Sequence, residues 1–432
     1  MKHVYVEDLG KHVGEKVMLK GWLANRSSKG KLHFLQFRDG TGFVQCVVFK
    51  KDVDEDTFEQ CNHIYQESSL TIEGEVREDK RAPSGVEVGV STVKLHQLSE
   101  DYPITPKEHG VDFLLQRRHL WLRSRKQMAI MRIRSEIIRA MCDFLFERGF
   151  IRMDTPILTP AACEGTTTLF EVDYFDLGAA FLSQSGQLYN EANAMGLGKV
   201  FCFGPTFRAE KSKTRKHLNE FWMLEPEWAY AELNDLIENS SELIRYTVGR
   251  VLETRRPELA ILERDTKKLE NINTPFPHIT FAEAVGIIRE GGLEIGDKED
   301  FGAPHEEFLG SYFGGQPVVV THWPKDIKAF YMKRGSDDDD VVLGMDIIAP
   351  EGYGEIVGGS QREDDFDILL KRIREEGLPE EVFEWYLDLR KYGSVPHGGY
   401  GLGLERFVGW ICGVDHVREC IPYPRTLNRI FP

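Results

Sequence analysis

Apolar and polar residues alternate along most of the first hundred positions of the chain. Glycine- and serine-containing turns separate five stretches that have this period of two. The stretches are residues 17–28, 31–39, 43–49, 68–79 and 86–98. Such alternation is typical of strands that bury one face, and a succession of short strands favours a barrel. We therefore predict a small five-stranded barrel of the OB type over residues 1–100, with one helix in segment 54–66.

The pattern changes after residue 100. Residues 101–126 contain two prolines and several basic residues, which indicates a hinge or linker between domains. From Met128 to Leu145 the apolar positions recur at helical spacing, and Gly149 follows them. This predicts a long amphipathic helix, followed by a strand within residues 150–158, at the start of a second domain that spans residues 127–432.

Two further apolar runs between Val200 and Tyr230 flank a charged loop, which predicts a strand, a loop and a strand. The ten residues Arg208–His217 contain five Lys or Arg and one acid, Glu210. An arginine at a strand end can bind phosphate oxygens in a bidentate way, and an aromatic ring at Phe221 can stack on a base. We interpret this loop as a docking site for an anion; a solvated hairpin tip is the alternative.

Two apolar runs within residues 341–363 each carry one carboxylate, Asp346 and Glu355. The preceding segment 325–335 is predicted to be a helix. Gly358 and the glycine after it would let the backbone come close to a ligand. Two strand carboxylates directed into one site suit Mg²⁺, which proteins usually hold with one or two carboxylates and substrate phosphates. Acids at this spacing are common, so the spacing alone leaves a role without metal open.

A glycine-rich run, residues 394–407, leads into the last predicted helix. It fits neither the Walker pattern nor GxGxxG within a βαβ unit, so the usual nucleotide-binding folds and a parallel doubly wound sheet are not indicated. A glycine-rich strand that enters a helix carrying Arg406 can still hold a triphosphate or cover an adenine ring.

Composition fits a globular chain of two or three domains, with 432 residues, 41% of them hydrophobic, and a formal charge of −16. No apolar run approaches a membrane span and the first residues lack a signal-peptide core, so we expect a cytoplasmic protein. The seven cysteines are scattered without CxxC spacing, which indicates buried thiols rather than disulfides or a zinc site. Net acidity does not exclude a local basic groove that binds nucleic acid.

One local basic stretch lies in the predicted barrel. Residues 25–33 carry Arg26 and two lysines with no acid, close to Phe34 and Phe37. OB barrels bind single-stranded nucleic acid by stacking bases on aromatic rings over a basic groove. Alternation places Phe34 and Gln36 on one face and Phe37 on the other, so at least one of the phenylalanines is expected in the core.

Three of these stretches together resemble the signature motifs of the class II aminoacyl-tRNA synthetases. FRAEKSKTRKHLNEF resembles motif 2, GYGLGLERF resembles motif 3, and the helix and strand ending in MDTPIL, with Pro156, resemble motif 1. Together with LSQSGQLYNEA, FGPTFRAE and IPYPR, they look most like the asparagine-specific members of the aspartyl, asparaginyl and lysyl subgroup. The resemblance covers essentially the whole chain. It implies an α+β fold, with an antiparallel six-stranded sheet and flanking helices in a catalytic domain, an anticodon-binding OB barrel, and a homodimer formed through motif 1.

The resemblance implies ATP-dependent ligation of L-asparagine to tRNA(Asn) through an asparaginyl-adenylate, with ATP and Mg²⁺ as cofactors. Catalysis would be positioning and charge neutralisation by Arg208, Arg406 and Mg²⁺, without a protein nucleophile. The implied ATP-binding roles are Arg208 at the α-phosphate, Phe221 and Arg406 on either side of adenine, His217 near the γ-phosphate and Glu210 beside the nucleotide. Asp346 and Glu355 match the family's Mg²⁺ ligands.

Other positions would bind the amino acid and the tRNA. The implied amino-acid site comprises Glu164, Ser185 and Gln187 at the α-amino group, Arg362 at the side-chain oxygen, and Glu191. Asn190 stands where aspartyl enzymes have a lysine that pairs with the β-carboxylate, and Glu191 would accept from the amide of asparagine and repel aspartate. In the alternative, Glu191 is an exposed helix residue. At the anticodon, Phe34 would stack on a base, Gln45 would read its edge, and Arg26 would lie nearby.

Three other functions stay open from the sequence. They are an aspartyl-tRNA synthetase, possibly non-discriminating, a paralogue that activates an amino acid without tRNA, and a single-strand-binding scaffold with an inactive catalytic domain. The motif arginines and both carboxylates argue against the scaffold, and amino-acid-dependent ATP–pyrophosphate exchange would separate these functions.

Overall fold

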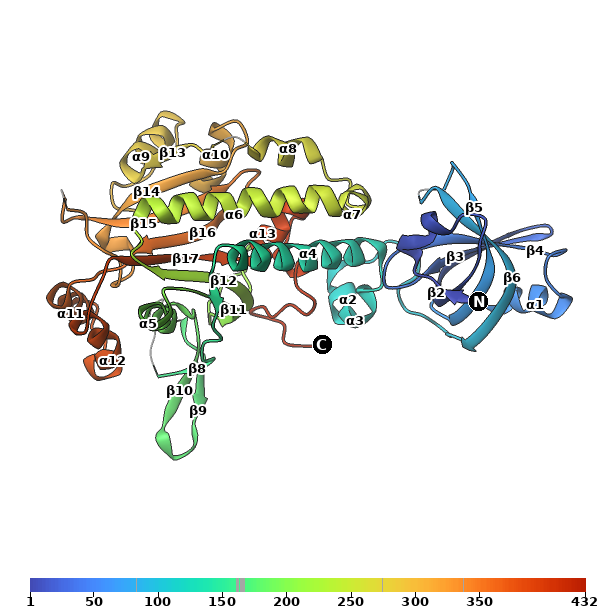
Figure 1. The fold of residues 1–432 in the computed structure, drawn as a ribbon, viewed down its shortest axis with the longest axis horizontal. Helices are drawn as coiled ribbons and strands as arrows, with labels where there is room; N and C mark the ends of the chain where they lie inside the picture. The colour runs from blue at the N-terminus through green and yellow to red at the C-terminus, as the bar shows by residue number, and fades with distance from the viewer. Residues whose placement is uncertain (83, 161–162, 164–167, 274, 337) are drawn as a thin grey trace. The chain divides into compact units, whose positions relative to one another are not determined.

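The computed structural model describes residues 1–432 apart from residues 83, 161–162, 164–167, 274 and 337 (Figure 1). These residues form two compact units, Met1–Met128 and Ala129–Pro432. The first unit therefore includes the whole predicted linker, residues 101–126, which carries the short helices α2 (Val111–Gln116) and α3 (Arg118–Trp121).

The first unit contains the predicted five-stranded barrel. Strand order β1-β2-β3-β4-β6-β5 is closed by pairing of β2 with β5, so the sheet wraps onto itself. The strands are β2 (Lys16–Lys29), β3 (Leu32–Arg38), β4 (Phe43–Phe49), β5 (Ser69–Glu78) and β6 (Val86–Gln97), with β1 (Lys2–His3) paired beside β2. Alternate residues such as Leu35 and Phe37 are fully buried in the barrel core, and burial of each large apolar side chain contributes about 1.5–3 kcal/mol.

The helix predicted in segment 54–66 is also confirmed. Helix α1 spans Glu55–Gln60, and the carboxylate of Asp54 accepts a hydrogen bond from the Thr57 amide at its first turn. This side-chain cap satisfies one of the backbone donors that a helix leaves free at its start.

The second unit is built on an eight-stranded sheet of order β13-β14-β15-β16-β17-β12-β11-β7. Its strands are β7 (Ile151–Arg152), β11 (Lys199–Phe207), β12 (Glu220–Ala229), β13 (His278–Thr280), β14 (Val318–Pro324), β15 (Val341–Ala349), β16 (Gly354–Gln361) and β17 (His397–Gly403). The six central strands are antiparallel, as expected. The short edge strands β7 and β13 pair in parallel and extend the expected six to eight.

Long helices cover the sheet. Helices α4 (Arg125–Glu147) and α6 (Leu233–Thr254) run side by side (Figure 1) and are joined by ion pairs such as Arg250–Glu136 at 3.3 Å. Their apolar faces share one core with the central strands and with α13 (Leu404–Cys412). The helix predicted from Met128 is thus confirmed. Gly149 follows its end with φ +79°, a left-handed backbone conformation that terminates helices and that glycine adopts without strain.

The remaining elements flank this sheet. The helices are α5 (Gln187–Leu197), α7 (Arg256–Ile261), α8 (Thr266–Glu270), α9 (Phe281–Glu290), α10 (Ala303–Tyr312), α11 (Phe366–Glu375) and α12 (Glu380–Lys391). A small three-stranded sheet is formed by β8 (Leu158–Thr159), β10 (Ala179–Leu182) and β9 (Glu171–Asp173). Of the seven cysteines, six are buried, as expected. Among the described residues, no helix has the length and apolar character needed to cross a membrane.

One prediction of secondary structure is wrong, and a second is confirmed only in part. Segment 325–335 is not a helix but a single 3₁₀ turn, Lys325–Ile327, followed by irregular chain. Its backbone bonds to the sheet instead, because the Lys333 amide donates to Gln361 and the Lys333 carbonyl accepts from Leu343. The strand predicted in residues 150–158 is confined to the two short pairings β7 and β8, and Pro156 between them has no amide hydrogen to donate to a ladder.

Candidate active site

Two cavities meet on the surface of the central sheet in the second unit. We call them the outer pocket and the inner pocket. Both are lined by Arg208, Met223, Glu355 and Gly401, so they form one continuous site. A Cβ atom at Gly401 would lie 2.4 Å from Cε of Met223, so the absence of a side chain at Gly401 leaves room for the end of Met223 on the floor of the site.

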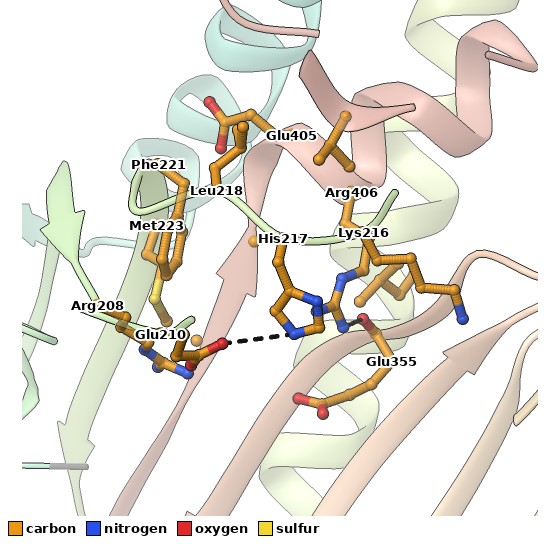
Figure 2. Close-up of a pocket in the computed structure, with 14 residues that line it drawn as sticks. Arg208, Glu210, Lys216, His217, Leu218, Phe221, Met223, Glu355, Glu405 and Arg406 are labelled. Atoms are coloured by element: carbon orange, nitrogen blue, oxygen red, sulfur yellow. Dashed lines mark hydrogen bonds and ion pairs between the residues drawn. The ribbon is translucent and has the colours of Figure 1, made fainter. Parts of the chain in front are cut away.

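The outer pocket gathers the predicted phosphate- and base-binding residues (Figure 2). The loop between β11 and β12 supplies Arg208, Glu210, Lys216 and His217, strand β12 supplies Phe221, strand β16 supplies Glu355, and helix α13 supplies Arg406. The predicted strand, loop and strand are confirmed by nine paired positions from Lys199↔Trp228 to Phe207↔Glu220. The two ends of the loop are therefore fixed by the hydrogen-bonded pair of strands β11 and β12.

Arg208 leaves the end of β11 beside the aromatic ring predicted for base stacking. Its guanidinium carbon lies 5.5 Å from the centre of the Phe221 ring. The side-chain amide of Asn219 donates to the carbonyls of Arg208 at 2.8 Å and Glu210 at 3.0 Å. Asn219 thus holds the two ends of the loop together and fixes where Arg208 begins.

Arg406 enters the outer pocket from the other side of the view in Figure 2. Its Nη1 donates to the carbonyl of Glu355 at 2.5 Å. Between the two sides lies His217, whose Nε2 is 3.5 Å from a carboxylate oxygen of Glu210. Burial and Arg406 lower the pKa of His217, although Glu210 opposes the change, so the ring is neutral at pH 7.

The inner pocket contains the two carboxylates proposed for Mg²⁺. A Cβ atom at Gly358 would lie 2.8 Å from Oε1 of Glu355 and 3.5 Å from Oδ1 of Asp346, so both carboxylates face the same glycine. Burial raises the pKa of Asp346 to about 7, and Lys328, 2.7 Å from its Oδ2, opposes the rise. Two oxygen donors beside an open backbone fit Mg²⁺, which takes its other ligands from phosphates and water.

The metal prediction rests on this pair. No group of three or more His, Cys, Asp or Glu that could hold a metal occurs among the described residues.

At the inner end of the site, Arg362 pairs with a carboxylate that sequence reasoning missed. Arg362 is paired with Glu227, and both side chains line the inner pocket although each is at least 98% buried. Arg362 also donates to the hydroxyl of Ser360 at 2.8 Å. Burial raises the pKa of Glu227 to about 8, while Arg362 opposes the rise. The pair offers a hydrogen-bond donor and an acceptor side by side.

Ser185 and Gln187 also line the inner pocket, as predicted. The Ser185 hydroxyl donates to Glu225, whose other oxygen accepts from the Gly186 amide at 3.0 Å. Glu225 was not predicted from the sequence. The sequence does contain a signal for it: Glu225 and Glu227 stand at alternate positions of a largely apolar strand, so both face the same side. Acids on a buried strand face indicate a polar site there.

Glu191 lies behind the inner pocket rather than on its wall. It is fully buried, which excludes the exposed-residue alternative. Its carboxylate accepts from Tyr386 at 2.7 Å and Arg390 at 2.8 Å, and Gln187 donates to it at 3.0 Å. Burial alone would raise the pKa of Glu191, but Arg390, His397 and Arg362 hold it below its usual value. Glu191 therefore reaches the pocket through two residues that line it, Gln187 and Arg362, whose Nε lies 3.9 Å from the Glu191 carboxylate.

Of the other two residues predicted near the amino acid, Asn190 is not among the described residues that line the inner pocket. Asn190 is buried and donates from its side chain to the Glu225 carbonyl at 3.2 Å. Glu164 lies outside the described residues.

A third cavity lies on the barrel and brings together two of the three predicted anticodon residues. Phe34 and Gln45 line it, with Gln36, Phe43, Arg81 and Arg125 among its other residues. Phe34 is half-exposed whereas Phe37 is fully buried, as alternation predicted. Arg26 is not brought to this cavity: it pairs in register with buried Leu35 and donates to the Cys61 carbonyl at 2.5 Å.

Two families match the chain. Residues 110–427 match tRNA synthetases class II (D, K and N), and residues 17–95 match the OB-fold nucleic acid binding domain. The chain is 55% identical to the asparagine–tRNA ligase of Pelotomaculum thermopropionicum over the full length of both chains. It is also 55% identical to that of Chloroflexus aurantiacus, over 99% of this chain and 98% of the relative.

Solved structures give the same picture. Asparaginyl-tRNA synthetase from Pyrococcus horikoshii complexed with asparaginyl-adenylate superposes with a TM-score of 0.95 at 46% identity, over the full length of both chains. The enzyme from Entamoeba histolytica in complex with asparaginyl-adenylate superposes with a TM-score of 0.87 at 32% identity, over 97% of each chain.

Proposed function

Because the chain belongs to the class II tRNA synthetases of the D, K and N group, we propose that it ligates L-asparagine to tRNA(Asn) through an asparaginyl-adenylate, using ATP. One observation of the structure carries the choice of amino acid. The inner pocket, which continues into the outer pocket, presents Arg362 and Glu227 as a paired donor and acceptor. A carboxamide has the matching acceptor and donor, whereas a carboxylate has only acceptors.

In the first step the carboxylate of asparagine attacks the α-phosphorus of ATP. A new bond forms between the carboxylate oxygen and phosphorus, and the bond from phosphorus to the bridging oxygen of the β-phosphate breaks, which releases pyrophosphate. Arg208, shared by both pockets, is placed to neutralise the α-phosphate. Phe221 and Arg406 would hold the adenine ring, and His217 would contact the triphosphate. Positioning and charge neutralisation supply the rate enhancement.

In the second step the adenylate is transferred to tRNA. A hydroxyl of the terminal ribose attacks the carbonyl carbon of the adenylate, and AMP leaves. The amino acid stays in place because Ser185, Gln187 and Glu225 surround the position expected for its α-amino group. Glu225 and the pocket around it would balance the ammonium charge. The chain needs no nucleophile of its own for either step.

Asp346 and Glu355 would hold Mg²⁺ with the phosphates of ATP. The metal would add positive charge beside the phosphates when it is bound. Lys328, which pairs with Asp346 at 2.7 Å, keeps part of the charge of this carboxylate compensated.

We also propose a homodimer formed through the motif 1 region. Several large apolar residues there are exposed, which supports a contact with a second copy: Phe146 is 53% exposed, Ile151 45%, Ile157 44% and Leu158 42%. Burying such a patch against its own copy would stabilise a dimer. A cytoplasmic location stays a prediction of the sequence.

The proposed function is tested by ATP–pyrophosphate exchange with each of the twenty amino acids in turn. We expect exchange with asparagine well above that with aspartate, no exchange after Mg²⁺ is chelated, and transfer of asparagine to tRNA(Asn). Preferred exchange with aspartate would identify an aspartyl enzyme. Exchange with asparagine that never leads to acylated tRNA would identify an activating paralogue instead.

For the barrel we expect that Phe34→Ala weakens tRNA binding by about 1–3 kcal/mol, because a base loses its stacking partner. Exchange without tRNA should stay unchanged, since Phe34 lies in the other unit from the two pockets. The measurement is tRNA affinity beside the exchange rate. Phe37→Ala serves as the contrast, because it removes a core side chain and should lower the free energy of unfolding by about 3–5 kcal/mol. Equal tRNA affinity of folded Phe34→Ala and wild type would contradict the assignment.

A further inference from the structure

Glu306 connects two parts of the outer pocket, the charged loop and strand β16, although it lies outside every signature motif. It stands in the first turn of α10, and its side chain is 16% exposed. One carboxylate oxygen, Oε2, lies 3.0 Å from Nζ of Lys216 in the charged loop. The other, Oε1, accepts from the backbone amide of Glu355 at 3.3 Å. One side chain therefore ties the loop to strand β16.

The residue before Glu355 is a glycine, which leaves space for the Glu306 carboxylate. Gly354 has φ +75°, and a Cβ atom there would lie 2.2 Å from Oε2 of Glu306 and 2.7 Å from Nζ of Lys216. Only glycine leaves room for the ion pair and tolerates this backbone conformation. The Glu355 carbonyl is held as well, because Arg406 donates to it at 2.5 Å. The peptide groups on both sides of a proposed Mg²⁺ ligand are thus fixed, one by Glu306 and one by Arg406.

The backbone beside Lys216 is anchored on either side, because the Arg215 carbonyl accepts from the Val417 amide at 3.1 Å and Leu218 is buried against Val417, whereas the Lys216 side chain is held by Glu306. Lys211, Lys213 and Arg215 of the same loop are exposed, while Lys216 is only 15% exposed and lines the outer pocket. A charge-assisted hydrogen bond between partly buried groups is stronger than one at the surface. Glu306 therefore sets where the Lys216 side chain lies in the outer pocket, while the backbone contacts hold the end of the loop.

We propose that Glu306 is a positioning residue for adenylate formation, which holds Lys216 and the Glu355 backbone so that the ATP pocket is assembled before the nucleotide arrives. This inference rests on the proposed function, because it assumes that the outer pocket binds ATP. Glu306 acts through Lys216 and Glu355 and needs no contact with ATP itself. Loss of its charge would release the Lys216 side chain, loosen the exposed part of the loop before it, and raise the ATP concentration needed for the reaction.

The first test is limited trypsin digestion of the full-length protein without ligands, with cleavage after Lys211, Lys213 and Arg215 followed by mass spectrometry. Glu306→Gln keeps the shape of the side chain and adds no trypsin site. We expect cleavage in the loop about fivefold or more faster than in wild type. Glu307→Gln, at the exposed neighbouring position on α10, is the matched control and should leave the cleavage rate unchanged. Equal cleavage rates in the two variants would overturn the proposal.

The second test is steady-state exchange with ATP or asparagine varied. Glu306→Gln should raise the KM for ATP about tenfold, while the KM for asparagine changes less than about twofold. Lys216→Met should raise the KM for ATP similarly, and the double variant should show no further rise, because both changes break one contact. Additive effects, or an equal rise in both KM values, would contradict a role through Lys216. If wild type activates no amino acid, the proposed function fails, and the digestion, which needs no turnover, still decides whether Glu306 orders the loop.

Discussion

Arg208→Ala and Arg406→Ala are each expected to reduce adenylate formation by about 30- to 1000-fold. Losing one preorganised charged contact to a reacting phosphate costs roughly 2–4 kcal/mol of transition-state stabilisation, and each 1.36 kcal/mol corresponds to a factor of ten. Arg208 lines both pockets, and Arg406 adds its hydrogen bond to the Glu355 carbonyl. Both changes should therefore affect kcat as well as the KM for ATP.

The fold should survive both substitutions, because the two side chains are half-buried and lie outside the apolar core. The measurement is asparagine-dependent ATP–pyrophosphate exchange, accompanied by thermal unfolding. Arg215→Ala is the matched control: it removes an exposed arginine of the same loop that does not line the outer pocket. Exchange near the wild-type rate in either Arg208→Ala or Arg406→Ala would refute the role given to that arginine.

The second large effect is expected at the inner end of the site, where Glu227→Gln should reduce the preference for asparagine over aspartate by about 100-fold or more at about pH 9, where the Glu227 carboxyl is ionised. An ionised carboxylate beside the β-carboxylate of aspartate costs several kcal/mol, and an unpaired buried donor costs about 1–3 kcal/mol. Glutamine removes the negative charge that Glu227 carries above its pKa and leaves Arg362 with only the more distant carboxylate of Glu191, at 3.9 Å. Exchange with both amino acids, expressed as a ratio of kcat/KM values, measures the change.

Measuring the same ratio of kcat/KM values at several pH values shows whether the amino-acid preference depends on the charge of Glu227 or on the shape of its side chain. Because burial raises the pKa of Glu227 to about 8, the carboxyl gains negative charge as the pH rises through that value. Activation of aspartate relative to asparagine should therefore fall between about pH 7 and about pH 9 in wild type. Glu227→Gln has no proton to lose and should show no such fall.

Glu191→Gln distinguishes this account from the hypothesis that Glu191 itself accepts from the substrate amide. Glu191 does not line the pocket: it lies behind Gln187 and Arg362 and is held by Arg390 and Tyr386. Its neutralisation should lower the free energy of unfolding, since Arg390 would be left buried without its counter-charge. A larger loss of asparagine preference in Glu191→Gln than in Glu227→Gln would favour the original hypothesis. The same outcome would make Asn190→Lys worth testing for a gain in aspartate activation.

Local patterns were sufficient for much of the fold. Period-two alternation separated Phe34 from Phe37 correctly, because a strand has no other way to place successive side chains. The apolar runs on both sides of residues 208–217 predicted strands β11 and β12, and the charge between them excluded a buried connection. The glycine-rich run before Arg406 predicted strand β17 and helix α13.

The errors arose where backbone groups found distant partners. Residues 325–335 have helix-compatible spacing, yet they bond to Gln361 and Leu343 at the end of the sheet, and such bonds cannot be read from a local window. Arg26 belongs to a basic stretch near Phe34, but strand register turns its side chain toward the Cys61 carbonyl.

The sequence alone determined the two-unit order, the barrel, the charged loop between β11 and β12 and most residues that line the outer pocket and the barrel cavity, because these follow from short periodic patterns and from motifs of defined chemistry. Only the tertiary structure showed that Glu227 rather than Glu191 lines the inner pocket beside Arg362, and that Glu306 meets Lys216 across 90 positions of sequence. From the sequence, a carboxylate could equally line a pocket, balance a buried positive charge, or hold two segments together through an ion pair. What distinguishes these roles is which charges from other elements surround it, and that depends on how strands and helices far apart in the chain come together.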